Sequence, residues 1–148
     1  MSRFRRILHP SDFSRASRRA FEKAVELAKA DRAELLLVHV LGPVLVPAEA
    51  YVPAKAYADM WASVRATGRK ELDTLAGRAR KAGARATTVL VEGSGAHEVI
   101  ARVARTRRAD LIVIGTHGRT GLAKAFLGSV AARVVAIAPC PVLTVRGS

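Results

Sequence analysis

The fold is decided by one stretch near the C-terminal end of the chain, which reads DLIVIGTHGR from Asp110 to Arg119. The run Leu111–Ile114 is apolar throughout and stops at a glycine, as a strand buried on both faces does. After the glycine loop, Gly128-Ser129 begins an apolar-periodic segment typical of a helix. A strand, a glycine loop and a helix start together offer unpaired N–H groups and the positive end of a helix dipole. The stretch therefore predicts an anion site at the end of a strand.

Apolar runs and helical periodicity alternate outward from this stretch along the whole chain. Strands are expected at Phe4–Pro10, Glu34–Val40, Thr87–Glu92, Leu111–Gly115 and Val142–Val145. Helices are expected at Ser14–Ala30, Pro53–Ala82, Ala96–Thr106 and Gly128–Ala138, and residues 41–53 form the longest loop. This alternation predicts one α/β domain over residues 1–148, an open parallel five-stranded sheet with helices on both faces. Ligands of such sheets bind beyond the carboxyl ends of the strands, where the strand order reverses.

The composition is that of a globular protein. The 148 residues are 50% hydrophobic and 25% charged, which is a balance that supports one buried core. No apolar stretch approaches the roughly 18 to 20 residues of a membrane span. No long apolar segment follows the basic start, and the single cysteine, Cys140, excludes an intramolecular disulfide. The expected location is therefore cytoplasmic, without a membrane partner.

The net charge of +13 is the unusual number, from 25 Lys and Arg against 12 Asp and Glu. One interpretation is a well-solvated surface, and the other is attraction to nucleic acid or another polyanion. The positive residues are spread along the chain, and aromatic residues make up only 5% of it. A dedicated nucleic-acid reader more often combines one basic stripe with exposed aromatic residues. The sequence therefore disfavours nucleic acid as the partner.

The pattern G-x2-G-x9-G-S from Gly115 to Ser129 resembles the nucleotide-binding signature of the universal stress protein family. Three other blocks in the same order, Ile7–Ser14, Leu35–Val40 and Pro139–Leu143, are similar to the first, second and last strands of that family. The resemblance implies the strand order 3-2-1-4-5 of the adenine nucleotide alpha hydrolase-like fold. It also implies ATP, alone or with Mg2+, as the ligand, a role as a stress-response regulator, and a homodimer through the C-terminal strand.

The resemblance, with the motif above, also selects the candidate binding residues. In the nucleotide-binding members, an aspartate at the position of Asp12 contacts the ribose hydroxyls. The adenine would lie against Pro10, Ser11 and the backbone around Val40. The full expected set is Pro10, Ser11, Asp12, Val40, Ile114, Gly115, His117, Gly118, Arg119, Gly128, Ser129 and Val130.

Several of these residues have a second interpretation. Asp12 or Ser14 can cap the following helix, and Arg119 is either a phosphate partner or a solvated loop arginine. His117 can contact phosphate or fold back on its own loop. Farther along the chain, Gly93-Ser94-Gly95 favours a tight turn over a phosphate loop.

No motif indicates an efficient enzyme. A Walker A loop is absent, and the four histidines and one cysteine have no metal-ligand spacing. His9 and His39 end apolar strands, so they are expected to be structural. With Asp12 assigned to the ribose, no general base is left near the phosphates. The sequence thus favours a nucleotide-binding protein with at most slow hydrolysis, and an ATPase of the same fold or a basic nucleic-acid-binding protein are the alternatives.

Overall fold

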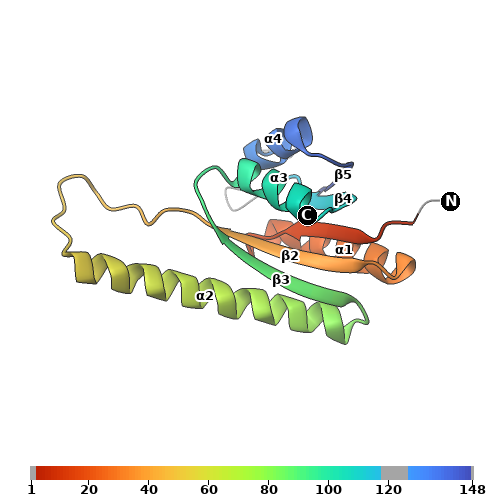
Figure 1. Ribbon diagram of the computed structural model, residues 1–148, viewed down its shortest axis with the longest axis horizontal. Coiled ribbons are helices and arrows are strands. Elements are labelled where there is room, and N and C mark those ends of the chain that lie inside the picture. The colour runs from red at the N-terminus through yellow and green to blue at the C-terminus, as the bar shows by residue number, and fades with distance from the viewer. Residues whose placement is uncertain (1–2, 118–126, 148) are drawn as a thin grey trace.

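The computed structural model describes residues 3–117 and 127–147. Its five strands form one parallel sheet in the order β3-β2-β1-β4-β5, which confirms the expected topology (Figure 1). The strands are β1 (Arg6–Pro10), β2 (Glu34–Leu41), β3 (Arg85–Glu92), β4 (Leu111–Gly115) and β5 (Val142–Val145). The helices are α1 (Arg18–Asp31), α2 (Ala54–Lys81), α3 (Ala96–Thr106) and α4 (Ser129–Ile137).

Alternate residues of the strands enter two separate cores. On one face, Ile7, Leu35 and Leu37 pack against α1 and α2. On the other face, Leu36 and Val38 pack against α3 and α4. The run Leu35–Val38 is at most 1% exposed, because side chains of both parities meet a helix layer. This double burial explains why the central strands are apolar throughout.

The first helix begins later than the sequence indicates. Its expected start was Ser14, but Arg15–Ser17 form a 3-10 turn and α1 begins at Arg18. Phe13 precedes this turn in the left-handed region, with φ of 63°. The Asp12 carboxylate accepts the Ser14 N–H at 2.9 Å. Ser17 is the N-cap residue of α1, and its side chain makes no capping hydrogen bond to the helix. The expected cap on the helix itself is therefore wrong, because Asp12 stabilises the turn before it.

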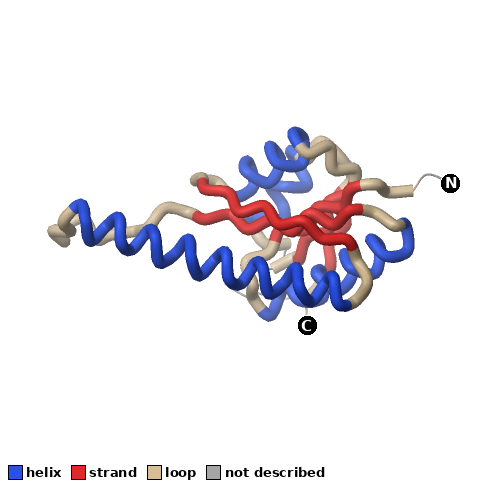
Figure 2. Tube along the Cα trace, turned by 60° about the horizontal axis from the view of Figure 1, so that its bottom comes forward, coloured by secondary structure: helices blue, strands red, loops and turns tan. Residues whose placement is uncertain are grey.

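The long helix α2 extends well past the end of the sheet (Figures 1 and 2). Its C-terminal half packs on β2 and β3 through Leu72, Ala76 and Ala79, which are fully buried. Gly68 is the first buried residue of the helix. None of the helices in the described part of the chain is long and apolar enough to cross a membrane.

His9 joins the two central strands from inside the protein. Its side chain is fully buried beside Phe21, and its Nδ1 donates a hydrogen bond to the Val113 carbonyl at 2.9 Å. Burial lowers the pKa of His9 to about 4, against the raising effects of that hydrogen bond and of the Asp12 charge. The expectation that His9 is structural agrees with this position, and the ring is neutral at pH 7.

The burial of a neutral His9 predicts acid-sensitive stability. Between pH 6.5 and about 4 the unfolded chain binds a proton that the folded protein does not, so stability falls as the pH is lowered. The loss across this window is about 3 kcal/mol in the free energy of unfolding. His9→Asn keeps an N–H near the position of Nδ1 but does not titrate. Urea unfolding at pH 7 and pH 4 should show a smaller loss for His9→Asn than for the wild type, and equal losses would contradict the assignment.

Candidate functional site

A cavity of about 300 Å³ opens at the carboxyl ends of β1 and β4. These two strands are neighbours in the sheet, and the chain order reverses between them. Crossover connections leave the two strands in opposite directions there, which opens a crevice. The cavity therefore lies where the sequence placed the site.

Ten of the twelve candidate residues line this one cavity. They are Pro10, Ser11, Asp12, Val40, Ile114, Gly115, His117, Gly128, Ser129 and Val130. The other two, Gly118 and Arg119, lie outside the described residues. Segments more than a hundred residues apart in the sequence thus meet at one edge of the sheet.

The sequence did not single out seven other lining residues. These are Ser17, Val38, His39, Ala96, Ile100, Thr116 and Ala131. Ala96 and Ile100 come from the first turns of α3, which follow Gly93-Ser94-Gly95, a stretch that the sequence assigned to a tight turn rather than to a phosphate loop. Their only sequence signal was the apolar face of that helix, and such a face does not say which of its residues borders a cavity.

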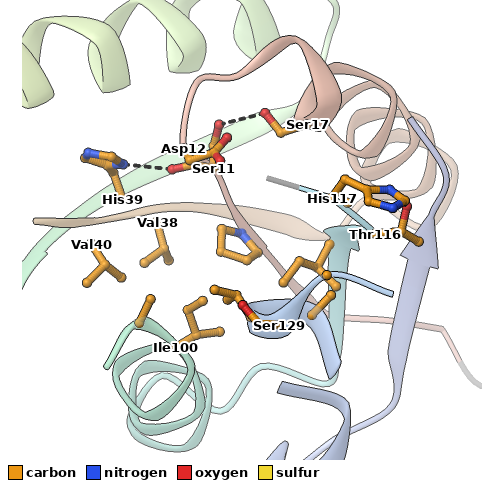
Figure 3. A pocket seen from close by; sticks show the side chains of 17 residues that line it. Ser11, Asp12, Ser17, Val38, His39, Val40, Ile100, Thr116, His117 and Ser129 are labelled. Carbon is orange, nitrogen blue, oxygen red and sulfur yellow. Dashed lines mark hydrogen bonds between the residues drawn. The ribbon is translucent and has the colours of Figure 1, made fainter. Parts of the chain in front are cut away.

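The walls of the cavity differ in polarity (Figure 3). Val38 and Val40 of β2 face Ile100 of α3 and make one apolar side. Thr116 and His117 lie on the other side, after β4. A flat apolar group fits the first side and a polar group the second, so the cavity suits a ligand with two unlike ends.

The loop after β1 is held in place by backbone and side-chain hydrogen bonds. Nδ1 of His39 donates to the Ser11 carbonyl at 2.8 Å, and the Ser11 N–H donates to the Val38 carbonyl at 2.8 Å. The Ser11 hydroxyl accepts the Phe13 N–H at 3.0 Å. These bonds tie the loop to β2, so the Asp12 carboxylate is positioned at the cavity before any ligand binds.

Helix α4 begins at the cavity. Ser129, Val130 and Ala131 form its first turn and all line the cavity. The N–H groups of a first turn have no partner within the helix, and the dipole adds positive charge there. The Gly128 N–H, by contrast, donates to the Thr116 carbonyl. Of the expected pair Gly128-Ser129, the Gly128 N–H is thus paired within the protein, and the first turn of α4 that follows it lines the cavity.

Gly128 has a steric reason to be glycine. A Cβ at this position would lie 2.6 Å from the Thr116 carbonyl oxygen, and a backbone oxygen cannot move aside as a side chain can. Gly115 is less crowded, since its Cβ would lie 3.3 Å from the Ala16 oxygen. Gly128 therefore lets the start of α4 approach the loop after β4, and Gly115 lets that loop approach the turn before α1.

The environments of His117 and Cys140 leave neither side chain as an evident reactive group. The Nδ1 atom of His117 lies 3.0 Å from the Thr116 hydroxyl, so its ring folds back on the loop. Burial, with a smaller effect of Asp110, raises the pKa of the Cys140 thiol, which keeps it protonated and unreactive. Gly95, with φ of 76°, is the N-cap residue directly before α3. Within the described residues no group of three histidines, cysteines or carboxylates could hold a metal ion.

Residues 3–146 match the model of the universal stress protein family. The chain is also 34% identical over 148 residues to universal stress protein YxiE of Bacillus subtilis, covering 97% of this chain and 99% of the relative. The chain belongs to the universal stress protein family. The resemblance seen in the sequence is thus confirmed over nearly its whole length.

Solved structures of the family have the same fold. Universal stress protein UspA from Lactobacillus plantarum has a TM-score of 0.84 at 25% identity, covering 99% of this chain and 100% of that protein. A universal stress protein crystallised in complex with cAMP has a TM-score of 0.70 at 27% identity, with coverages of 99% and 100%. The family's α/β architecture therefore extends over nearly the whole chain.

The crowding at Gly128 yields a testable difference between two glycines. Gly128→Ala should lower the free energy of unfolding by about 1 to 3 kcal/mol, because the added Cβ overlaps the Thr116 oxygen. Gly77 on the exposed side of α2 is the matched control, since a Cβ there meets nothing within 4 Å. Gly77→Ala should raise stability by about 0.5 to 1 kcal/mol. Urea unfolding of both variants tests this, and a neutral Gly128→Ala would show that the close approach is not required.

Proposed function

We propose that this protein binds an adenine nucleotide, ATP in particular, in the cavity at the ends of β1 and β4. The observation that carries the proposal is the meeting of an apolar wall, a fixed carboxylate and a helix N-terminus around one cavity. The complex of a family member with cAMP supports this ligand class. A volume of about 300 Å³ also lies within the range of small-molecule sites.

In the proposed complex each part of the nucleotide meets a matching part of the cavity. The adenine lies between Val40 and Ile100, where apolar side chains cover a planar ring. The ribose hydroxyls donate to the Asp12 carboxylate, which is a strong charged acceptor. The phosphates extend toward the first turn of α4, where backbone N–H groups and the helix dipole stabilise negative charge. In this arrangement Mg2+ would be held mainly by the phosphates rather than by protein carboxylates.

The proposed activity is binding, with at most slow hydrolysis. Asp12 is the only carboxylate among the lining residues that the structure describes, and the proposal places it on the ribose. The described ring of His117 is turned toward Thr116. Without a positioned base, an attacking water has no group to orient it. The protein would then act as a cytoplasmic regulator in the stress response, whose state reports on nucleotide supply.

The first prediction concerns the phosphate end of the cavity. ATP and ADP should raise the melting temperature of the wild type, since a ligand at a hundredfold excess over Kd adds about 2.7 kcal/mol. Val130→Asp places a negative charge in the first turn of α4 and should lower the affinity for ATP by about tenfold or more. Val135→Asp is the control, because Val135 is on the same helix but does not line the cavity. No thermal shift with millimolar ATP would exclude the proposed ligand.

The second prediction separates the two roles of Asp12. Asp12→Asn keeps an oxygen that can accept the Ser14 N–H but removes the charge that would bind the ribose. It should leave the melting temperature of the free protein nearly unchanged and reduce the binding free energy of ATP by about 1.5 to 3 kcal/mol. Inorganic triphosphate, which has no ribose, should lose much less affinity. Calorimetric titration of both ligands decides the matter, and equal losses would mean that Asp12 only stabilises the loop.

We also propose a homodimer through the C-terminal strand. β5 is the last strand of the sheet, and among the described residues it pairs with β4 alone. An open edge carries unpaired N–H and C=O groups that invite another strand. Pairing with the β5 of a second copy would satisfy both edges and bury Leu143, which is 37% exposed.

The dimer predicts a mass near twice the 15.8 kDa of one chain at micromolar concentration. Leu143→Lys should lower this mass toward one chain, because a charge at each edge would be buried in the pair. Lys81→Ala, on the exposed end of α2 and far from β5 in the sequence, serves as the control. Light scattering that returns one chain for the wild type in this range would refute the edge pairing.

A further inference from the structure

A segment of 26 residues projects from the body of the protein. This arm consists of the loop 42–53 and the first half of α2, residues 54–67, and it extends past the ends of β2 and β3 (Figures 1 and 2). In the helical part every residue is exposed except Trp61, which is half-buried. A Cβ added at Gly68 would lie 3.1 Å from the Leu41 side chain, so Gly68 marks the point where α2 reaches the sheet. The arm therefore extends beyond the sheet that covers the rest of its helix, apart from its last turn, where Arg65 pairs with Glu92 at the end of β3.

The composition of the arm differs from that of the remaining chain. It contains four charged residues, Glu49, Lys55, Asp59 and Arg65, whose charges balance. The whole net charge of +13 is therefore carried by the rest of the protein. Both tyrosines of the chain and its only tryptophan lie in the arm: Tyr51, Tyr57 and Trp61. Tyr, Trp and Met are the residue types enriched in protein interfaces, where charged residues are depleted.

The apolar face of the arm continues the face that α2 buries on the sheet. Tyr57, Trp61 and Val64 precede Gly68 and Leu72 at spacings of three and four residues, so they lie along one side of the helix. The polar residues Lys55, Asp59 and Ser63 fall on the opposite side by the same geometry. Tyr57, Met60 and Val64 remain 37 to 40% exposed, and in the loop Leu45 and Tyr51 are 86% and 90% exposed. This half of the helix is thus amphipathic. Its own described chain covers the apolar side only in part, since the Arg65 guanidinium lies 5.7 Å from the centroid of the Trp61 ring and pairs with Glu92 at the end of β3.

Large exposed apolar side chains gather in two places among the described residues. Five belong to the arm. The other five lie in α4, in β5 or two residues before α4, and they are Leu127, Val130, Val135, Ile137 and Leu143. The arm adjoins β2 and β3, whereas β5 is at the opposite edge of the sheet. A dimer through β5 therefore leaves the arm uncovered.

We propose that the arm is a second self-association surface, which pairs with the arm of another copy of this chain. Two bodies of charge +13 repel each other, so contact between copies of this protein meets the least repulsion through a segment without net charge. The arm is such a segment, while an acidic or polyanionic partner would select the basic body instead.

The length of the arm makes the pairing electrostatically feasible. The helical part of 14 residues spans about 20 Å at 1.5 Å per residue. Two arms that pair side by side, antiparallel, leave the bodies at opposite ends of the pair. That separation exceeds the roughly 10 Å over which charges act at 0.1 M salt. The pair is isologous, so each arm supplies the same apolar face to the other.

Trp61 gives the pairing a direct signal, because it is the only tryptophan and lies within the proposed interface. Leu143→Lys removes the proposed β5 dimer and isolates the arm. In this variant, raising the protein from micromolar to hundreds of micromolar should shift the Trp61 emission to shorter wavelength, and light scattering should rise from one chain to two. The wild type over the same range should rise above two chains. These readouts do not depend on nucleotide, so the result does not depend on the proposed ligand.

Two lysine substitutions at neighbouring positions provide the matched pair. Val64→Lys on the apolar face should abolish both the emission shift and the mass increase. Ser63→Lys, on the opposite face and of equal charge, should change neither by more than about twofold in the midpoint concentration, since a rim charge contributes little. If Leu143→Lys fails to fold, the single variant Val64→Lys replaces it. The mass of this variant should remain that of two chains at all concentrations.

Three outcomes would overturn the proposal. The first is a Trp61 emission and a mass that do not change with concentration in either background. The second is an emission shift that the wild type shows with concentration and that Leu143→Lys alone abolishes, as Val64→Lys alone does. This result would assign the arm to the α4 and β5 surface of a neighbouring copy. The third is a shift that appears only with anionic lipid vesicles, which would assign the arm to a membrane surface.

Discussion

The structure depends on the burial of β1, β2 and β4 on both faces of the sheet. Ile7, Leu8 and the run Leu35–Val38 are almost fully excluded from solvent. Helices must cover both sides of strands like these, and crossover helices make the strands parallel. Parallel strands end at the same edge, which brings the loops after β1 and β4 together. The cavity is a direct consequence of this arrangement.

The same burial sets the constraints at the edge of the cavity. His9 lies between α1 and the sheet as a neutral ring, and its bond to Val113 links β1 to β4 beneath the site. Close packing of the two loops leaves no room for a side chain at Gly128. The site is therefore preorganised by groups that the proposed complex does not place on the nucleotide. Preorganisation of this kind lowers the entropic cost of binding.

Charge and apolar surface are segregated in this protein. The body carries the whole excess of positive charge, whereas the arm is neutral and the segment from α4 to β5 contains only Arg133. A high net charge favours solubility and opposes association. The two low-charge surfaces lie at opposite edges of the sheet, so contacts through both can connect more than two copies. In the proposed assembly the arms keep basic bodies apart, and the contact at β5 uses the part of the body with the fewest charges.

The arm also illustrates where periodicity and structure diverge. The spacing of Tyr57, Trp61 and Val64 is the same as that of the buried residues farther along α2, and it predicts one continuous helix. The helix is indeed continuous, over Ala54–Lys81. Its length exceeds that of the strands that it covers, since β3 has eight residues and α2 has 28. Only the assembled sheet reveals that the first half of the helix extends past the strands that its second half covers.

The sequence by itself determined the strands, the order of elements and the glycine loop with the helix start after it, because apolar runs, glycines and helix starts are local signals. The resemblance to a family added lining residues such as Pro10, Asp12 and Val40. The strand order and the ligand class came from the resemblance to a family rather than from any local pattern. Tertiary structure decided the rest. Ala96 and Ile100 border the cavity because α3 crosses the sheet there, and the Gly128 N–H is used by Thr116 because two distant loops touch. Such contacts depend on how helices pack across the sheet, and residue spacing along a chain does not encode those distances.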